Sequence, residues 1–367
     1  MIAIVDYGVG NLFSLRSSLR YLGLAAEVTA DADTLRRAER IILPGVGAFA
    51  DARARLDDSG LTPLLLEEAE KKPFLGICLG MQLLFERSFE YGEHPGLGLI
   101  GGSMAKSIKA RTGHTVYGVD LGAETMTMAR MCGAIDAPLT DDNLGACDLI
   151  LIAIRPQAAI DWVKSHAAAI SKSAIVVDLC GVKRSVVAAI APVAEQYGFA
   201  YIGGHPMAGK ERGGFTASAE DLYVGASMIL TPDKRTDMRL LETLKAFFLD
   251  LGFAGLTFST PEEHDRIIAF TSQLAHIVSS AYVKSPEAQK RRGFSAGSFQ
   301  DMTRVARLDE DMWTELFLDD EDFLTAELEE LIGHLTDYRN ALRAKDTQRL
   351  HDLLKEGREL KATAGGN

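Results

Sequence analysis

The stretch HPGLGLIGGSMAKSIK, from His94 to Lys109, decides how the chain divides and how its larger part folds. It contains Gly-x-Gly-x-x-Gly at Gly96, Gly98 and Gly101. Such a triplet ends a buried strand and opens a helix whose N-terminus holds a dinucleotide pyrophosphate. SMAKSIKAR predicts the helix, but the preceding RSFEYGEHP is charged, poor in β-branched residues and broken by proline. The sequence therefore predicts a Rossmann-like domain that lacks its usual first strand.

Composition is that of a soluble globular protein of two or three domains. The 367 residues are 47% hydrophobic and 25% charged, and the net charge is -12 at pH 7. This acidity argues against nucleic acid or an anionic membrane as the main partner. We see no signal peptide and no apolar run of membrane-spanning length. The four cysteines form no Cys-x-x-Cys pair, so we expect reduced thiols in a cytoplasmic protein.

Residues 1–95 alternate strand and helix patterns. IAIVDYG, AAEVTA, RIILPGVG and PFLGICLG have strand composition, and NLFSLRSSLRYLG and LTPLLLEEAEK have helical spacing. The alternation predicts a parallel sheet covered on both faces. GICLGMQ sets Cys78 between glycines, after a strand and before a helix, as in a nucleophile elbow. Taken alone, such a motif is as often a buried cysteine at a strand end.

The segments DYGVGNLFSL, LPGVGAF, GICLGMQLLFERSFEYG and PGLGLI occur in this order. Over roughly residues 1–100 the chain resembles the N-terminal half of the glutaminase subunit of imidazole glycerol phosphate synthase, a class I glutamine amidotransferase of histidine biosynthesis. The resemblance implies Cys78 as the nucleophile, with Gly45 and Gly47 near the oxyanion. The family also needs a His and a Glu two residues apart, later in the chain, to activate the thiol, and this chain has no such pair. We therefore expect a truncated, vestigial glutaminase domain.

A second α/β pattern begins at Gly96. Asp120 ends the strand HTVYGVD, 19 positions after Gly101. That is near the ~20-residue spacing at which an acidic residue holds the ribose of NAD. A lone glycine triplet is more often an ordinary loop, but the triplet, the following helix and this aspartate together favour an NAD site. No metal site is expected.

Further strands and then helices follow. DLILIAI, AIVVDLCG and YIGGHPMAG predict buried strands, whose ends place Asp178, Lys183 and His205 at the rim of the ligand crevice. After about residue 236 the segments are long and apolar-striped, which predicts a helical domain that covers the site and forms a dimer. The expected domains are 1–95 (amidotransferase-like), 96–235 (dinucleotide-binding) and 236–367 (helical).

The segments GLGLIGGSMAKSIK, DLCGVKRSV, GGHPMAGKERGGF, EEHDRIIAFTSQLAH and GSFQDMTRVAR occur in this order. From Gly96 to about residue 360 the chain resembles prephenate dehydrogenase of tyrosine biosynthesis. The resemblance implies oxidative decarboxylation of prephenate to 4-hydroxyphenylpyruvate with NAD as the oxidant.

Two residues fit this chemistry directly. His205 can accept the hydrogen of the ring hydroxyl, although a strand-end histidine is more often a structural residue. Arg304 in DMTRVAR can bind a substrate carboxylate through a bidentate fork, although a surface ion pair is the commoner role of an arginine.

Two further pairs lie in EEHDRIIAFTSQLAH. Gln273 and His276, three residues apart, can share one helical face and line the substrate pocket, or form a helix–helix hydrogen bond instead. We interpret His264 and Asp265 as helix-start and positioning groups.

The segment GLGLI is part of the motifs of both families and occurs once in the chain. The simplest interpretation is a chimera, made by deletion in a genome or by an error of sequence assembly. Three functions stay open: a prephenate dehydrogenase impaired by its missing strand, a glutaminase disfavoured by its missing His/Glu pair, and a non-catalytic protein that docks on a synthase subunit.

Overall fold

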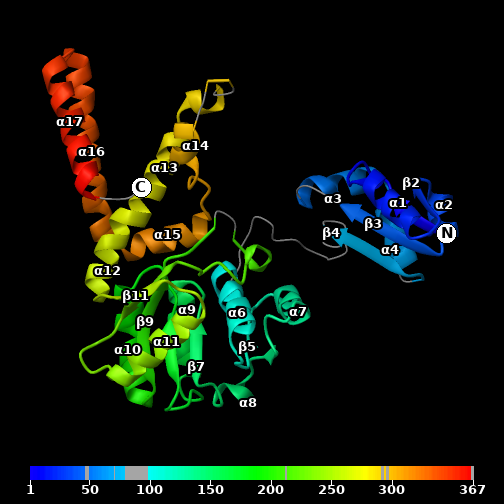
Figure 1. Cartoon of the computed structure of the whole chain (residues 1–367), viewed down its shortest axis with the longest axis horizontal. Helices are drawn as coiled ribbons and strands as arrows, with labels where there is room; N and C mark the ends of the chain where they lie inside the picture. The colour runs from blue at the N-terminus through cyan, green and yellow to red at the C-terminus, as the bar shows by residue number, and fades with distance from the viewer. Residues whose placement is uncertain are drawn as a thin grey trace. The chain divides into compact units, whose positions relative to one another are not determined.

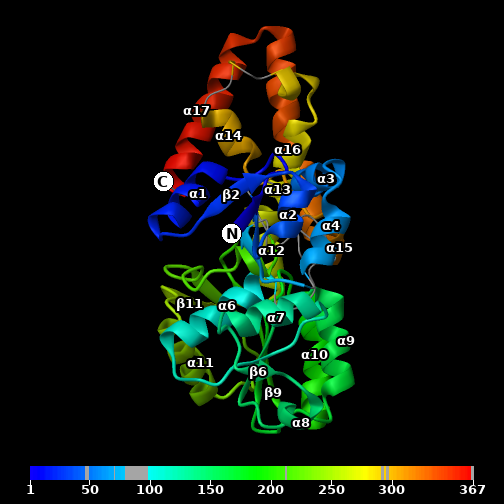
Figure 2. The same cartoon turned by 90° about the vertical axis from the view of Figure 1, so that its right-hand side faces the viewer.

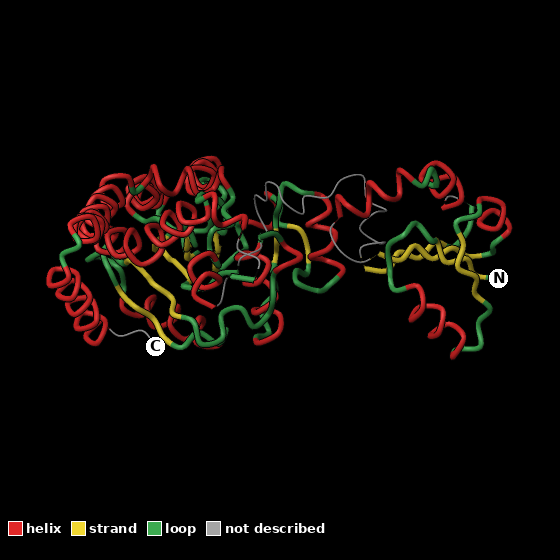
Figure 3. The backbone as a smooth tube through the Cα atoms, turned by 90° about the horizontal axis from the view of Figure 1, so that it is seen from above, coloured by secondary structure: helices red, strands yellow, loops and turns green. Residues whose placement is uncertain are grey.

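The computed structural model describes residues 1–45, 49–69, 71–78, 98–210, 213–290, 293–294 and 297–364. The chain forms two compact units, Met1–Glu93 and His94–Asn367, which are described separately (Figures 1 and 3). Among the described residues, no helix is both long and apolar enough to cross a membrane.

The first unit is a four-stranded parallel sheet in the order β2-β1-β3-β4. Ile2 and Ile4 of β1 pack with Leu19 of α1, whereas Ala3 and Val5 belong to the cluster on the opposite face. The sheet is therefore covered on both faces, as the alternating pattern predicted. Its elements are β1 (Ile2–Val5), α1 (Leu12–Tyr21), β2 (Ala26–Thr29), α2 (Ala32–Arg37), β3 (Arg40–Gly45), α3 (Phe49–Asp58), α4 (Thr62–Ala69) and β4 (Phe74–Cys78).

The second unit is built on a five-stranded sheet in the order β11-β10-β9-β8-β7. Strands β7, β8 and β9 are parallel, β10 runs antiparallel to β9, and β11 is parallel to β10. The strands are β7 (Leu149–Ile152), β8 (Ile175–Asp178), β9 (Ala200–Pro206), β10 (Ser227–Thr231) and β11 (Gly255–Phe258).

Helices cover both faces of this sheet (Figure 2). One face packs on α9 and α10 through residues such as Val163 and Ile190, and the other packs on α6 and α11 through Met104 and Phe248. The helices of this layer are α6 (Leu99–Arg111), α7 (Ala123–Met131), α8 (Asp141–Leu144), α9 (Pro156–His166), α10 (Arg184–Tyr197), the 3-10 turn η1 (Phe215–Ala217) and α11 (Met238–Asp250).

A separate two-stranded parallel sheet holds β5 (Tyr117–Gly118) and β6 (Ala137–Pro138). In a doubly wound sheet the strand before the glycine loop lies between these two groups of strands. The described residues contain no such strand. The described residues therefore form a Rossmann-like layer, which confirms the α/β fold class expected from the sequence, and the segment just before Gly98 lies outside them.

Among the described residues, β5 and β7 border this position. β7 ends the five-stranded sheet, and its Leu149 and Leu151 are only partly buried, whereas Val176 and Val177 of β8 are fully buried. β5 has two residues, and Val119 and Leu121 just beyond it are exposed. We expected a longer strand reaching Asp120. Among the described residues, the backbone groups of β5 pair with β6 alone, which accords with its short length.

The C-terminal part is helical, with α16 and α17 side by side (Figure 1). Its elements are α12 (Pro261–Ile268), the π-helix η2 (Ala269–Leu274), α13 (Ala275–Val283), the 3-10 turn η3 (Pro286–Lys290), α14 (Gly297–Thr303), α15 (Glu310–Asp319), α16 (Glu321–Ala344) and α17 (Thr347–Ala364). The sheet layer continues further along the chain than residue 235, because α11 packs on the sheet and β11 pairs with β10.

Candidate functional site

The glycine loop leads into a buried helix. α6 begins at Leu99, directly after its N-cap Gly98, so Gly101 lies in the first turn. The expected cofactor residue Gly96 lies outside the described residues. A Cβ atom on Gly102 would come within 2.6 Å of the Phe215 ring, so the helix packs closely against η1. The exposed amides of a helix N-terminus form a site for phosphate groups, and Gly98 adds no side chain to obstruct it.

Asp120 lies two residues after β5, at the position expected for a ribose-binding carboxylate. One of its oxygens accepts a hydrogen bond of 2.6 Å from the backbone N–H of Gly122, the N-cap of α7. This bond fixes the side chain at the end of the strand.

His205 lies near the end of β9, opposite Ile229 of β10. Its Nδ1 is 2.9 Å from Nε2 of His264, and Nδ1 of His264 is 2.7 Å from Oδ1 of Asp265. Burial of the ring, together with His264 and the Lys183 charge, holds the pKa of His205 well below its ordinary value. A neutral imidazole is therefore available at neutral pH as a proton acceptor.

A buried ion pair lies near His205. Lys183 and Asp178, expected at the crevice rim, are fully buried and bonded to each other, and Tyr201 donates a 2.7 Å hydrogen bond to Asp178. The glycines of GGHP make room for them. A Cβ atom on Gly203 would meet Lys183 Cδ at 3.1 Å, and one on Gly204 would meet the Asp178 carbonyl oxygen at 2.8 Å.

Arg184 joins the sheet layer to the helical part. Its guanidinium bonds Asp322, with one contact at 2.8 Å, and Asp320 at 2.9 Å, both at the start of α16. Burial and Asp265 raise the pKa of Asp320 to about 7, against the effect of Arg184. Arg184 thus holds α16 against α10, close to Asp265.

The structure groups His276 with Trp313 and places Arg304 near enough for its charge to act on the imidazole. The His276 and Trp313 ring centroids are 4.0 Å apart. Burial lowers the pKa of His276, the Ser272 carbonyl opposes this effect, and the Arg304 charge adds to it. Nδ1 of His276 donates to that carbonyl at 2.8 Å, which leaves Nε2 as an acceptor.

Gln273 lies in the π-helix η2, and His276 follows in α13. The α-helical argument for a shared face does not hold across a π turn, because its turn is wider. The Gln273 side chain is buried, and its Oε1 has no hydrogen-bond partner among the described residues. An unmet buried acceptor is costly, and π turns are frequent at functional sites, so Gln273 stays a candidate ligand contact.

In the first unit, Gly45 and Cys78 are register partners on β3 and β4. The expected nucleophile and one expected oxyanion residue are therefore adjacent at the ends of parallel strands. Gly47 and the side chain of Cys78 lie outside what the structure describes. Residues 1–93 contain no histidine.

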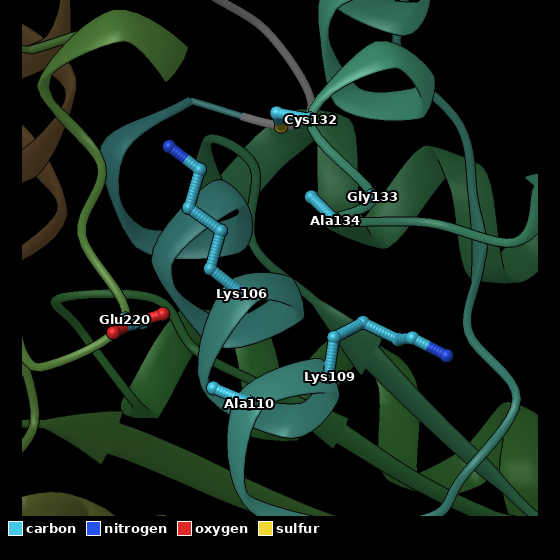
Figure 4. A pocket seen from close by; sticks show the side chains of 7 residues that line it. All are labelled: Lys106, Lys109, Ala110, Cys132, Gly133, Ala134 and Glu220. Atoms are coloured by element: carbon cyan, nitrogen blue, oxygen red, sulfur yellow. The ribbon is translucent and has the colours of Figure 1, made fainter.

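A surface pocket of about 370 Å³ lies beside α6 and holds none of the expected site residues (Figure 4). Both of its lysines are already bonded. Lys106 donates to the Ser218 carbonyl, and Lys109 pairs with Asp136 at 2.9 Å. The described residues contain no group of three or more His, Cys, Asp or Glu side chains that could hold a metal ion.

Sequence reasoning did not identify Trp313 or Arg184 as neighbours of the site. DEDMWTELF is amphipathic and gives no sign that its tryptophan packs on His276. The motif DLCGVKRSV contains Arg184, and an arginine directly after this strand end could have indicated a contact with carboxylates of the helical part.

The second unit is similar to prephenate dehydrogenases. The model of the prephenate dehydrogenase nucleotide-binding domain matches residues 104–254, and that of the dimerization domain matches residues 260–356. The chain is 29% identical to prephenate dehydrogenase of Bacillus subtilis over 273 residues, which cover 72% of this chain and 73% of the relative.

Two solved structures are similar to the second unit. Prephenate dehydrogenase of Aquifex aeolicus, in complex with hydroxyphenyl propionate and NAD+, is 28% identical with a TM-score of 0.65, over 74% of this chain and 96% of that one. Arogenate dehydrogenase of Synechocystis is 27% identical with a TM-score of 0.61, over 74% of this chain and 98% of that one.

The N-terminal part of the chain matches a different family model, which extends beyond the first unit. The class I glutamine amidotransferase model covers residues 3–129. The chain is 58% identical over 106 residues to imidazole glycerol phosphate synthase subunit HisH of Exiguobacterium sibiricum, which cover 29% of this chain and 54% of that protein. The chain spans about half the length of such curated HisH relatives. The chain is therefore a composite, similar to class I glutamine amidotransferases at its N-terminus and to the two domains of prephenate dehydrogenase over residues 104–254 and 260–356.

Proposed function

We propose that the chain is an NAD-dependent prephenate dehydrogenase whose activity is limited by its missing strand. The observation that carries the proposal is His205, held at the end of β9 with a lowered pKa and a hydrogen bond to His264. It lies in the same domain as the α6 N-terminus and Asp120, which suit the pyrophosphate and the ribose of NAD.

Each group has a task in this reaction. NAD, when bound, supplies the hydride acceptor. His205 accepts the proton of the ring hydroxyl while the ring carbon is oxidised, and loss of the ring carboxylate as CO2 leaves an aromatic ring. Arg304 binds a substrate carboxylate, and Gln273 and His276 contact the rest of the substrate.

A second substrate, arogenate, is favoured by one observation. Arogenate carries an ammonium group where prephenate has a keto oxygen. His276 is neutral in its present setting and presents Nε2 as an acceptor, which suits an ammonium donor better than a keto oxygen. The two substrates therefore have to be compared directly.

The test is NAD reduction by the intact chain with each substrate, followed by NADH absorbance, with glutamate release from glutamine measured in parallel. The proposal predicts NADH formation with prephenate and no glutamate. NADH with arogenate alone would transfer the assignment to that substrate. Glutamate release without NADH formation would refute the dehydrogenase assignment.

Arg304→Ala is expected to raise the KM for prephenate by about 10–100-fold while kcat changes little, because a hydrogen bond to a charged group contributes roughly 1.5–3 kcal/mol. Steady-state kinetics at saturating NAD measure the effect. Arg307→Ala, three residues away, is the matched control and should leave KM near its original value. A normal KM in Arg304→Ala would remove Arg304 from substrate binding.

We also propose that the second unit forms a homodimer through its helical part, the region matched by the dimerization domain. Large apolar side chains on α16 and α17 are exposed in the single chain and would be covered in a dimer. They are Ile332, Leu335, Leu342, Leu354 and Leu360.

No glutaminase activity is expected from the first unit, with or without a synthase subunit, because its 93 residues include no histidine that could deprotonate Cys78. The thiol can still react with an alkylating agent. Glutamate release is measured for the chain and for Cys78→Ser. A release that Cys78→Ser abolishes would reveal a base that this account lacks.

A further inference from the structure

A line of hydrogen bonds runs from His205 into the interior of the second unit. It passes from Nδ1 of His205 to His264, over 2.9 Å, and from His264 to the carboxylate of Asp265, over 2.7 Å. His264 and Asp265 are buried, and both lie on α12. The line joins β9 of the sheet to the first helix of the helical part.

Asp265 is fixed by backbone donors from another element. The N–H groups of Lys183 and Arg184, at the start of α10, donate to its two oxygens at 2.8 Å each. Burial alone would raise the pKa of Asp265, but His264 and these two N–H groups outweigh burial and hold that pKa below its ordinary value. Asp265 is therefore an ionised carboxylate, which only accepts hydrogen bonds.

The donor and the acceptor of each hydrogen bond in this line follow from the ionised state of Asp265. Because Asp265 accepts, Nδ1 of His264 carries a proton. In neutral His264, Nε2 is then the bare nitrogen and accepts from His205. The proton of neutral His205 must therefore lie on Nδ1, and its Nε2 carries the free lone pair.

We propose that His264 and Asp265 are positioning residues that fix the tautomer of His205, so that its Nε2 is the atom that accepts the substrate proton. This inference rests on the proposed dehydrogenase function and adds the atom and its control. The same carboxylate stabilises the imidazolium that forms when His205 takes the proton, as carboxylates do in other acid–base groups.

Among the described residues, two groups act on the pKa of His205 through their charge. His264 faces it from α12, and Lys183 faces it from the start of α10. Lys183 is paired with Asp178 of β8, which also accepts from Tyr201 of β9. Removal of the Asp265 charge is therefore the substitution that acts most directly on the two histidines through the line of bonds.

The tautomer of His205 can be determined by NMR without a measurement of enzyme activity. In the intact chain labelled with 15N-histidine, the protonated and bare nitrogens of a neutral imidazole have well-separated 15N shifts. The His205 signals are identified by their loss in His205→Asn. The proposal predicts a proton on Nδ1 and a bare Nε2. A proton on Nε2 of His205 would overturn it, whether or not the chain oxidises prephenate.

Kinetics test the role of the carboxylate. Asp265→Asn should lower kcat by about 10²-fold, with a smaller change in the KM for prephenate, since general-base loss is worth ~10²–10⁴-fold. It should also move the acid limb of the kcat/KM profile to lower pH, because the pKa of His205 falls when the carboxylate no longer stabilises its protonated form. A merely structural role would leave that limb in place.

Glu262→Gln is the matched control. It removes one negative charge from the same helix at an exposed position, and both kcat and the acid limb should stay unchanged. An unmoved acid limb in Asp265→Asn, or an equal shift in Glu262→Gln, would contradict the proposal. NADH formation failing in the unsubstituted chain would count against the proposed function alone, and the 15N tautomer would still decide the inference.

Discussion

His205→Asn should lower kcat for prephenate oxidation by ~10²–10⁴-fold, the usual effect of losing a general base. The KM for prephenate should change much less, because the hydrogen bond to the substrate strengthens as the hydroxyl becomes a carbonyl. Steady-state NADH formation measures both constants. The lowered pKa of His205 adds a second expectation: the base stays neutral, and activity persists, below the ordinary histidine pKa.

His114→Asn is the control for this substitution, because His114 is an exposed histidine in the same layer of the fold. It should leave kcat unchanged. A His205→Asn enzyme that retains full kcat would exclude His205 as the base, and the assignment of the proton acceptor would have to be made again.

Replacing residues 1–95 with methionine and about five Ile and Val residues should raise the stability of the second unit by a few kcal/mol, or about 2–4 °C in Tm per kcal/mol. The added strand would pair with β5 and β7 and would cover the partly buried Leu149 and Leu151. The chain's only two tryptophans, Trp162 and Trp313, lie in this unit, so tryptophan fluorescence follows its unfolding alone.

A second replacement controls for the loss of the first unit. It removes the same residues and inserts a Gly/Ser segment of equal length, which has no tendency to form a strand. Its Tm should stay near that of the original chain. Equal Tm values for the Ile/Val and the Gly/Ser versions would contradict the idea that a strand position is open.

The local order of strands and helices could be predicted from sequence, because it depends on patterns within a few residues. The apolar runs at β1, β3, β4, β7 and β8 and the glycine start of α6 are of this kind. The composition of RSFEYGEHP also predicts that no strand precedes Gly98, and this segment lies outside the described residues. The sequence analysis did not identify β10 and β11, which are short runs flanking the strongly apolar helix α11.

The candidate site could be predicted only as separate residues. His205, His276 and Arg304 were found from motifs, but their partners come from elsewhere in the chain. Asp265 meets the backbone of Lys183, 82 residues earlier, only because α12 packs on α10. The π turn at η2 likewise changes which helix face Gln273 shares with His276, and residue spacing in the sequence does not predict a π turn. Such contacts depend on tertiary packing, which local patterns do not encode.

The affinity for NAD, measured by titration of the intact chain and of the version with the Ile/Val strand, tests the central claim most directly. We propose that the second unit is a dehydrogenase whose glycine loop lacks the strand that normally positions it. We therefore expect weak NAD binding by the intact chain and a Kd at least about tenfold lower with the strand, equal to ~1.4 kcal/mol. Equal affinity in the two proteins would contradict it and would mean that the first 95 residues already support the glycine loop.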